Sequence, residues 1–217
     1  MSVKFKEIRD ALMNKIDAAK DDLDGTIAKK LLEVKYWNYA TDIHYTHIPY
    51  DHELFKIKKG RKLTKMSFDD RLTKRTIHSF GFDRDNRLII MQNPNVDNDI
   101  SFGVSTQLYF IKSDKSVETY VARWYPQKDF PTTLEALSIL SENDDGNLTY
   151  VGMNANKRNW SSMEYIRNEA GRIEKVESVV YPPPPPSDGI SIYDFEYGNE
   201  GELVKILAGS VVWWSKK

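Results

Sequence analysis

Apolar residues recur at helical spacing over the first part of the chain. They fall three and four residues apart, with lysine, glutamate and aspartate between them, at Phe5, Ile8, Leu12, Ile16, Ala19 and Leu23. This period predicts an amphipathic helix, which Asp24-Gly25 is expected to end because glycine readily takes the left-handed conformation. A shorter helix capped by Thr26 should follow. Residues 1–37 therefore predict an N-terminal helical hairpin packed on the protein's own sheet.

From residue 76 on, a turn signal recurs with apolar residues at fixed distances around it. The turns centre on Asn86, Lys115, Gly146, Gly171 and Gly201. Six residues before them stand Phe80, Tyr109, Leu140, Tyr165 and Phe195, and two residues after them Leu88, Val117, Leu148, Ile173 and Leu203. Glycine and asparagine tolerate the positive φ of hairpin turns, so each unit predicts a β-hairpin with one apolar face. Lys115 fits this pattern least well.

Hairpins with an apolar face are marginal alone and bury that face by stacking into one sheet. The patterns together predict an α+β fold in one domain, residues 1–217, with a helical segment at 1–37 and an antiparallel sheet of stacked β-hairpins over 41–214. A hairpin is expected to turn near Gly60. Residues 132–141 stay open between helix, for which Thr132 and Glu135 supply a capping box, and strand. Pro182–Pro186 predict a stiff, extended spacer.

The hairpin units carry a family resemblance. The stretches NDDGNLTYVG, YIRNEAGRIEKVE and DFEYGNEGELVKIL resemble the YD-type repeats of Rhs and related polymorphic-toxin proteins, over about residues 77–214. The resemblance implies an open, curved sheet of β-hairpins and a polymorphic-toxin context. It transfers no catalytic residue.

Composition narrows the class of protein. The chain of 217 residues has no cysteine, which excludes a disulfide framework, a thiol nucleophile and a thiolate metal site. No run of apolar residues approaches the roughly 20 that a membrane helix needs. The N-terminus alternates charged with apolar residues and so lacks the apolar centre of a signal peptide. We expect a cytoplasmic protein without a membrane partner.

Candidate catalytic chemistry is sparse. His44, His47 and His52 lie close in the sequence, but a strand would point His44 and His47 to opposite faces, and we interpret all three as structural residues. The acids near the turns, including Asp144, Asp145 and Glu169, suit turn hydrogen bonding. No phosphate-binding loop, nucleophile elbow or dinucleotide motif is present. The sequence therefore predicts a protein that is not an enzyme and needs neither metal nor cofactor.

Charge is uneven along the chain. Residues 56–75 hold nine basic residues and two acidic ones, although the net charge of the whole chain is −1. This strip is interpreted either as a solvated, lysine-rich edge of the sheet or as a surface for an acidic protein partner. Nucleic acid or another anionic ligand is the alternative, which a sequence pI of about 6.4 makes less favourable. With the resemblance, we predict an immunity protein that occludes a cognate toxin. The expected partner-binding residues are exposed ones: Lys58, Lys59, Arg61, Lys62, Tyr45 and Tyr50.

Overall fold

A computed structural model describes residues 3–64, 77–94, 104–125, 130–182 and 188–216. The architecture is α+β: within these ranges three helices accompany a 13-stranded antiparallel sheet. The helices are α1 (Val3–Lys20), α2 (Leu23–Glu33) and α3 (Asp51–Leu54). The strands are β1 (Tyr36–Ala40), β2 (Lys62–Leu63), β3 (His78–Phe82), β4 (Leu88–Pro94), β5 (Val104–Ser113), β6 (Ser116–Trp124), β7 (Thr133–Glu142), β8 (Leu148–Asn154), β9 (Trp160–Arg167), β10 (Ile173–Tyr181), β11 (Ile190–Tyr197), β12 (Leu203–Ala208) and β13 (Val211–Ser215).

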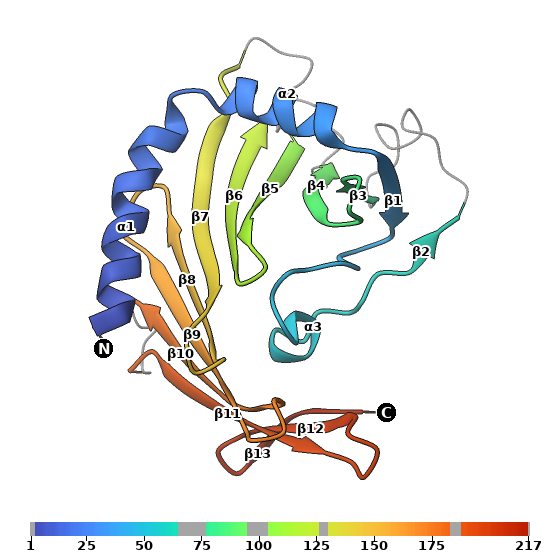
Figure 1. The fold of residues 1–217 in the computed structure, drawn as a ribbon, viewed down its shortest axis with the longest axis vertical. Coiled ribbons are helices and arrows are strands. Elements are labelled where there is room, and N and C mark those ends of the chain that lie inside the picture. The colour runs from blue at the N-terminus through green and yellow to red at the C-terminus, as the bar shows by residue number, and fades with distance from the viewer. Residues whose placement is uncertain (1–2, 65–76, 95–103, 126–129, 183–187, 217) are drawn as a thin grey trace.

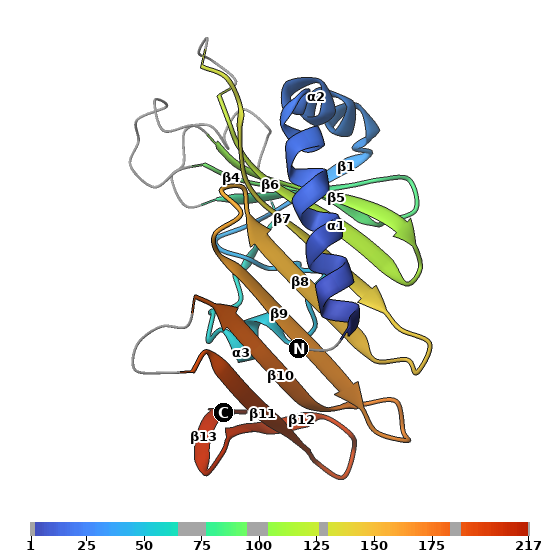
Figure 2. The same cartoon turned by 90° about the vertical axis from the view of Figure 1, so that its left-hand side faces the viewer.

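The sheet is a curved meander. Strands β3 to β13 lie in chain order, β1 pairs with β3, and β2 is the edge strand beyond β1. The sheet bends into an open arc, with α1 and α2 along its outer face and residues 41–61 inside it (Figure 1). The view from the side shows α1 crossing the strands obliquely (Figure 2). Each face of the sheet therefore has its own covering layer.

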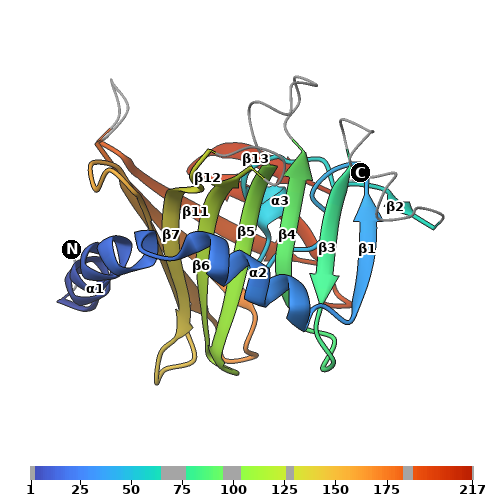
Figure 3. The ribbon, with the colours of Figure 1, turned by 90° about the horizontal axis from the view of Figure 1, so that it is seen from above.

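The outer layer is built by the N-terminal helices. Leu12 and Ile16 of α1 and Leu23 of α2 pack against β7 and β8, while Ile27 of α2 packs against β4 and β5. The two helices thus follow one another over different strands, as the view from above also shows (Figure 3), and the predicted helical hairpin is not confirmed. Among the described helices, none combines the length and the apolar character that crossing a membrane requires.

The boundary between the helices differs from the sequence prediction. Helix α1 ends at Lys20, and the cap of α2 is Asp22, whose carboxylate accepts a hydrogen bond of 3.1 Å from the Gly25 amide. Gly25 lies inside the first turn of α2, where a β-carbon would stand 2.5 Å from the Asp22 carboxylate. Glycine here makes room for the cap, so the stop predicted at Asp24-Gly25 and the cap predicted at Thr26 are wrong.

The predicted hairpin repeat is present from β3 onward. The pairs β3–β4, β5–β6, β7–β8, β9–β10 and β11–β12 join at the predicted turns. In four of them the turn residue has positive φ, between 60° and 82°: Asn86, Gly146, Gly171 and Gly201. Lys115 is not among the residues with positive φ, and its strands join through a shorter turn at 114–115. The exception is the residue that fitted the pattern least.

The four positive-φ turns share one hydrogen-bond pattern. The turn residue's amide donates to the carbonyl three residues earlier, as in Gly146 to Asn143 at 3.0 Å and Gly171 to Asn168 at 2.8 Å. In three of the turns the side chain of that earlier residue also accepts a hydrogen bond from the backbone amide that follows the turn residue. The accepting residues are Asp83, Asn143 and Asn168. This is the three-residue hairpin loop that ends in a left-handed residue.

The repeat places its apolar residues on the inner face of the sheet. Directly opposite residues are those four before and two after the turn, such as Phe82 with Leu88 and Tyr197 with Leu203. The residue six before the turn lies two further along the same strand and shares that face. The resulting clusters contain, among others, Phe80, Leu88, Tyr109, Tyr165, Ile173 and Phe195. Residues 133–141 prove to be strand, since β7 spans Thr133–Glu142, and Thr132 lies just before it.

Replacing Gly171 with alanine is expected to lower the free energy of unfolding by about 1–2 kcal/mol, because an L-residue in the left-handed region meets its own backbone. Gly171 has φ +75°, and a β-carbon there would contact nothing within 4 Å, so the cost is conformational. Urea denaturation measures it. Glu169→Ala in the same loop is the control, with a change within about 0.5 kcal/mol; equal losses in both variants would contradict the turn geometry as the cause.

Candidate functional site

Residues 41–61, which we call the inner segment, leave β1, cross the inner face of the sheet and return to β2. The segment carries α3, and buried Leu54 fixes it to the sheet: the indole Nε1 of Trp213 donates to the Leu54 carbonyl at 2.8 Å. The prediction of a hairpin turn near Gly60 is wrong. Gly60 lies against the backbone of Asp42, and its amide donates to the Ile43 carbonyl at 2.9 Å. Glycine is needed there for the close approach of two chain stretches.

The two predicted tyrosines of the site lie on this segment, half-buried. The Tyr45 ring meets Phe80 and Phe82 edge-on, with ring centres 5.1 Å apart in both pairs. Tyr50 packs edge-on against Phe195 at 5.0 Å, and its hydroxyl lies 3.1 Å from that of Tyr197. The prediction that these tyrosines are exposed is therefore wrong. The apolar face of the hairpins needs a cover, and these rings supply it.

The predicted basic residues lie on the last turn of the inner segment and on β2. We call this set the basic ridge: Lys58, Lys59, Arg61 and Lys62, all exposed. None of the four forms an ion pair with another described residue. Lys62 Nζ stands 5.0 Å from the centre of the Tyr45 ring. Lys56, the fifth described basic residue of the strip, has its Nζ 3.8 Å from the centre of the Trp213 ring. The remaining four lie outside the described residues: Lys65, Arg71, Lys74 and Arg75.

The three histidines of the segment are used separately. His44 Nδ1 lies 2.6 Å from the Gly60 carbonyl, and His47 Nε2 lies 3.0 Å from the Leu88 carbonyl. Burial lowers the pKa of His47, so the ring is neutral and donates through Nε2. Both ring nitrogens of His52 are buried without a hydrogen-bond partner. Among the described residues, no three His, Asp or Glu side chains are placed to share a metal ion.

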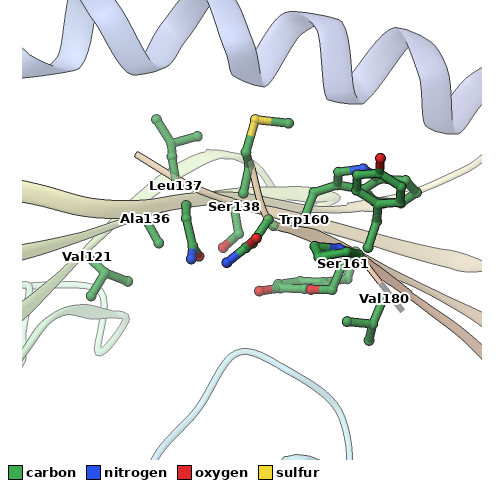
Figure 4. Close-up of a pocket in the computed structure, with 14 residues that line it drawn as sticks. Val121, Ala136, Leu137, Ser138, Trp160, Ser161 and Val180 are labelled. Carbon is green, nitrogen blue, oxygen red and sulfur yellow. The ribbon is translucent and has the colours of Figure 1, made fainter. Parts of the chain in front are cut away.

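Three adjoining hollows lie along the inner face. An outer cleft of about 620 Å³ is bordered by His44, Lys59 and Asp114, and an inner cavity of about 270 Å³ lies under the inner segment. They adjoin, since Tyr45, Thr46, His47 and Val117 line both. A third, open hollow of about 380 Å³ lies over Ala136, Ser138 and Ser161, and shares Ser138, Val121 and Tyr150 with the inner cavity. Figure 4 shows Val121 and Val180 on the side of the strands away from the helices and Leu137 pointing toward the helices.

The inner cavity brings together residues that the sequence did not combine. Asp51 of α3 faces it with Tyr109 of β5 and Tyr150 of β8. Burial raises the pKa of Asp51 and of both tyrosines. The sequence offered one signal, an aspartate set between aromatic and apolar residues in IPYDHELF. The tyrosines come from hairpins far along the chain, so only the fold places them beside that aspartate.

Comparison with known proteins finds no matching family model, no matching curated protein and no matching solved structure.

Proposed function

We propose that this chain is a non-enzymatic protein-binding protein, an immunity protein that neutralises a bacterial toxin by covering its active surface. The observation that carries the proposal is the basic ridge. Four exposed cations without ion-pair partners among the described residues stand together on a segment fixed from below. Several cations elsewhere pair within the fold, as in Arg87 with Asp83 at 2.7 Å and Arg123 with Glu135 at 2.6 Å. Unpaired charge on a firm support favours an acidic partner.

The anchoring of the segment supports a protein partner. Leu54 and the rings of Tyr45 and Tyr50 hold the inner segment against the sheet. The backbone that carries the ridge is therefore ordered before a partner binds, which favours affinity. The half-buried tyrosines take the role of support rather than of direct contact. Lys58, Lys59 and Arg61 are the residues expected to meet the partner.

The toxin context rests on the resemblance of the turn stretches to YD-type repeats. Those stretches contain the glycine turns of β7–β8, β9–β10 and β11–β12, which share their hydrogen bonds and their apolar inner face. A shared turn is compatible with the family's curved sheet of hairpins. An immunity protein is the member of such a system that acts by binding alone, and occlusion requires a surface rather than a catalytic site.

The proposal predicts a toxin gene beside this one, and the test is binding to the protein that it encodes; a neighbourhood without such a gene, or a product that does not bind, would count against the proposal. We expect a stable complex by light scattering with size exclusion, and its dissociation constant by calorimetry. Reversing the ridge, Lys58→Glu, Lys59→Glu, Arg61→Glu and Lys62→Glu together, should weaken binding about 100-fold, since several charge pairs become repulsive. The control reverses four other exposed cations, Lys29, Lys35, Arg84 and Lys216, with the same change in net charge and a much smaller effect.

Two outcomes would overturn the proposal. One is equal weakening by the ridge and the control variants, because net charge and not the ridge would then set the affinity. The other is tight binding of labelled single-stranded DNA or RNA that disappears in the ridge variant and falls steeply with salt. That result would favour the alternative function, nucleic-acid binding, over toxin binding.

A further inference from the structure

The inner cavity is a partly enclosed space with routes to solvent. Its roof is the inner segment, through residues such as Ile43, Thr46 and Asp51, and its floor is the sheet, through Tyr109 and Tyr150. The outer cleft and the open hollow share lining residues with it. The cavity therefore borders hollows that are open to solvent, and we expect a small molecule to enter from them. Its volume of about 270 Å³ lies just below the usual range of ligand pockets.

Asp51 supplies the formal negative charge of the cavity lining. The Thr46 side chain lowers the pKa of Asp51, but burial outweighs it and raises the pKa. No lysine or arginine of the described residues pairs with it, and the residues that follow it in the sequence are His52 and Glu53. His47, the other ionisable group besides tyrosines that lines the cavity, is neutral. A carboxylate taken out of water without a cationic partner is stabilised when a cation joins it.

The walls suit the rest of an organic cation. The rings of Tyr45, Tyr109 and Tyr150 line the cavity, and aromatic faces attract ammonium and guanidinium groups. The Tyr109 hydroxyl donates to Gln107 Oε1 at 2.9 Å, which leaves its oxygen free to accept. Apolar side chains complete the lining and would contact methylene groups: Ile43, Ile48, Ile57, Met91 and Leu140.

We propose that the inner cavity binds a small organic cation, a primary ammonium or guanidinium group on a short aliphatic chain, with Asp51 as its counter-ion. A metal ion fits less well, because the lining offers one carboxylate and a hard cation takes several oxygen ligands. An anion would be repelled by Asp51. At the outer cleft, Arg87 is neutralised by Asp83 and Asp85 at 2.7 and 2.9 Å, and the lining contains Asp114 as well as Lys59, so the mouth does not exclude a cation.

The experiment titrates the full chain with n-pentylammonium and n-pentylguanidinium by calorimetry, with n-pentanol as the neutral probe of similar size. We expect the cations to bind at least about tenfold more tightly than the alcohol. Asp51→Asn should remove about tenfold or more of the cation affinity. Asparagine keeps the size of the side chain and removes only its charge, so the variant is expected to fold. Asp114→Asn, at the outer cleft, is the matched control and should leave affinity unchanged.

Pentanol binding as tightly as the cations would overturn the proposal, because the cavity would then be only an apolar space. So would an Asp51→Asn variant with full cation affinity, or no cation binding at about 10 mM. The comparison of cation with alcohol uses the unaltered protein and does not depend on any variant folding. These probes leave the basic ridge untouched, so their failure would not bear on toxin binding.

Discussion

Phe80→Ala is expected to lower the free energy of unfolding by about 3–5 kcal/mol, among the largest losses that a single truncation produces. Phe80 is 0% exposed, lies on β3 near the start of the meander, and meets the ring of Tyr45 from the inner segment. Truncation removes buried apolar area and leaves a void between the sheet and the inner segment, which these two elements cannot fill. Urea denaturation followed by tryptophan fluorescence measures the loss.

The control for this variant is Phe55→Ala, which removes the same ring from a side chain that is 47% exposed. Its expected change is within about 0.5 kcal/mol. A loss below about 1 kcal/mol for Phe80→Ala would show that the inner face is not a close-packed core. Such a result would also remove the packing reason for the half-burial of Tyr45.

Phe80 illustrates what could be predicted from the sequence. Its distance from Asn86 matches the distances of Tyr165 and Phe195 from their glycines, and all three rings lie in the inner-face clusters. A turn that needs positive φ and a strand period of two are local constraints, so they leave a mark at fixed spacing in the chain. Local spacing is therefore sufficient to predict the hairpin array and its apolar face.

The inner segment could not be predicted in the same way. Gly60 follows a run of alternating residues and resembles a hairpin turn, yet its role is set by Asp42, which lies against it. Tyr50 interacts with Tyr197 across 147 positions of sequence. Contacts at such separations have no local period, and the exposure of a tyrosine depends on them. For that reason the sequence does not predict the half-burial of the two tyrosines, whereas the exposure of the charged residues of the basic ridge agrees with the prediction.

The same reason explains the residues around 132–141. Thr132 and Glu135 form a capping-box pattern, but each side chain has a partner elsewhere: the Thr132 hydroxyl donates to Asp24, and Glu135 accepts from Arg123 Nε at 2.7 Å. Strand pairing on both sides of β7 then satisfies its backbone. Tertiary partners outweigh a local helix signal, whose own contribution is about 1 kcal/mol.

Leu54→Ala is expected to cost about 2–5 kcal/mol and to loosen the support of the basic ridge. Leu54 is 4% exposed on α3, and its carbonyl accepts from Trp213 on β13, so the residue joins the inner segment to the last strand of the sheet. Relative to the unaltered protein, we expect the substitution to speed up amide exchange more over 51–61 and in β13 than in β7. Affinity for the proposed toxin partner should fall as well, although Leu54 is buried and cannot touch a partner.

Leu32→Ala is the matched control, because the same truncation at a side chain 88% exposed should change the free energy of unfolding by no more than about 0.5 kcal/mol. The pattern of exchange decides between two readings of a destabilised Leu54→Ala variant. Loosening confined to the inner segment and β13 means that α3 holds the ridge in place. Uniform loosening of the whole sheet, with toxin affinity unchanged once the folded fraction is corrected for, would contradict that role and leave α3 as core packing only.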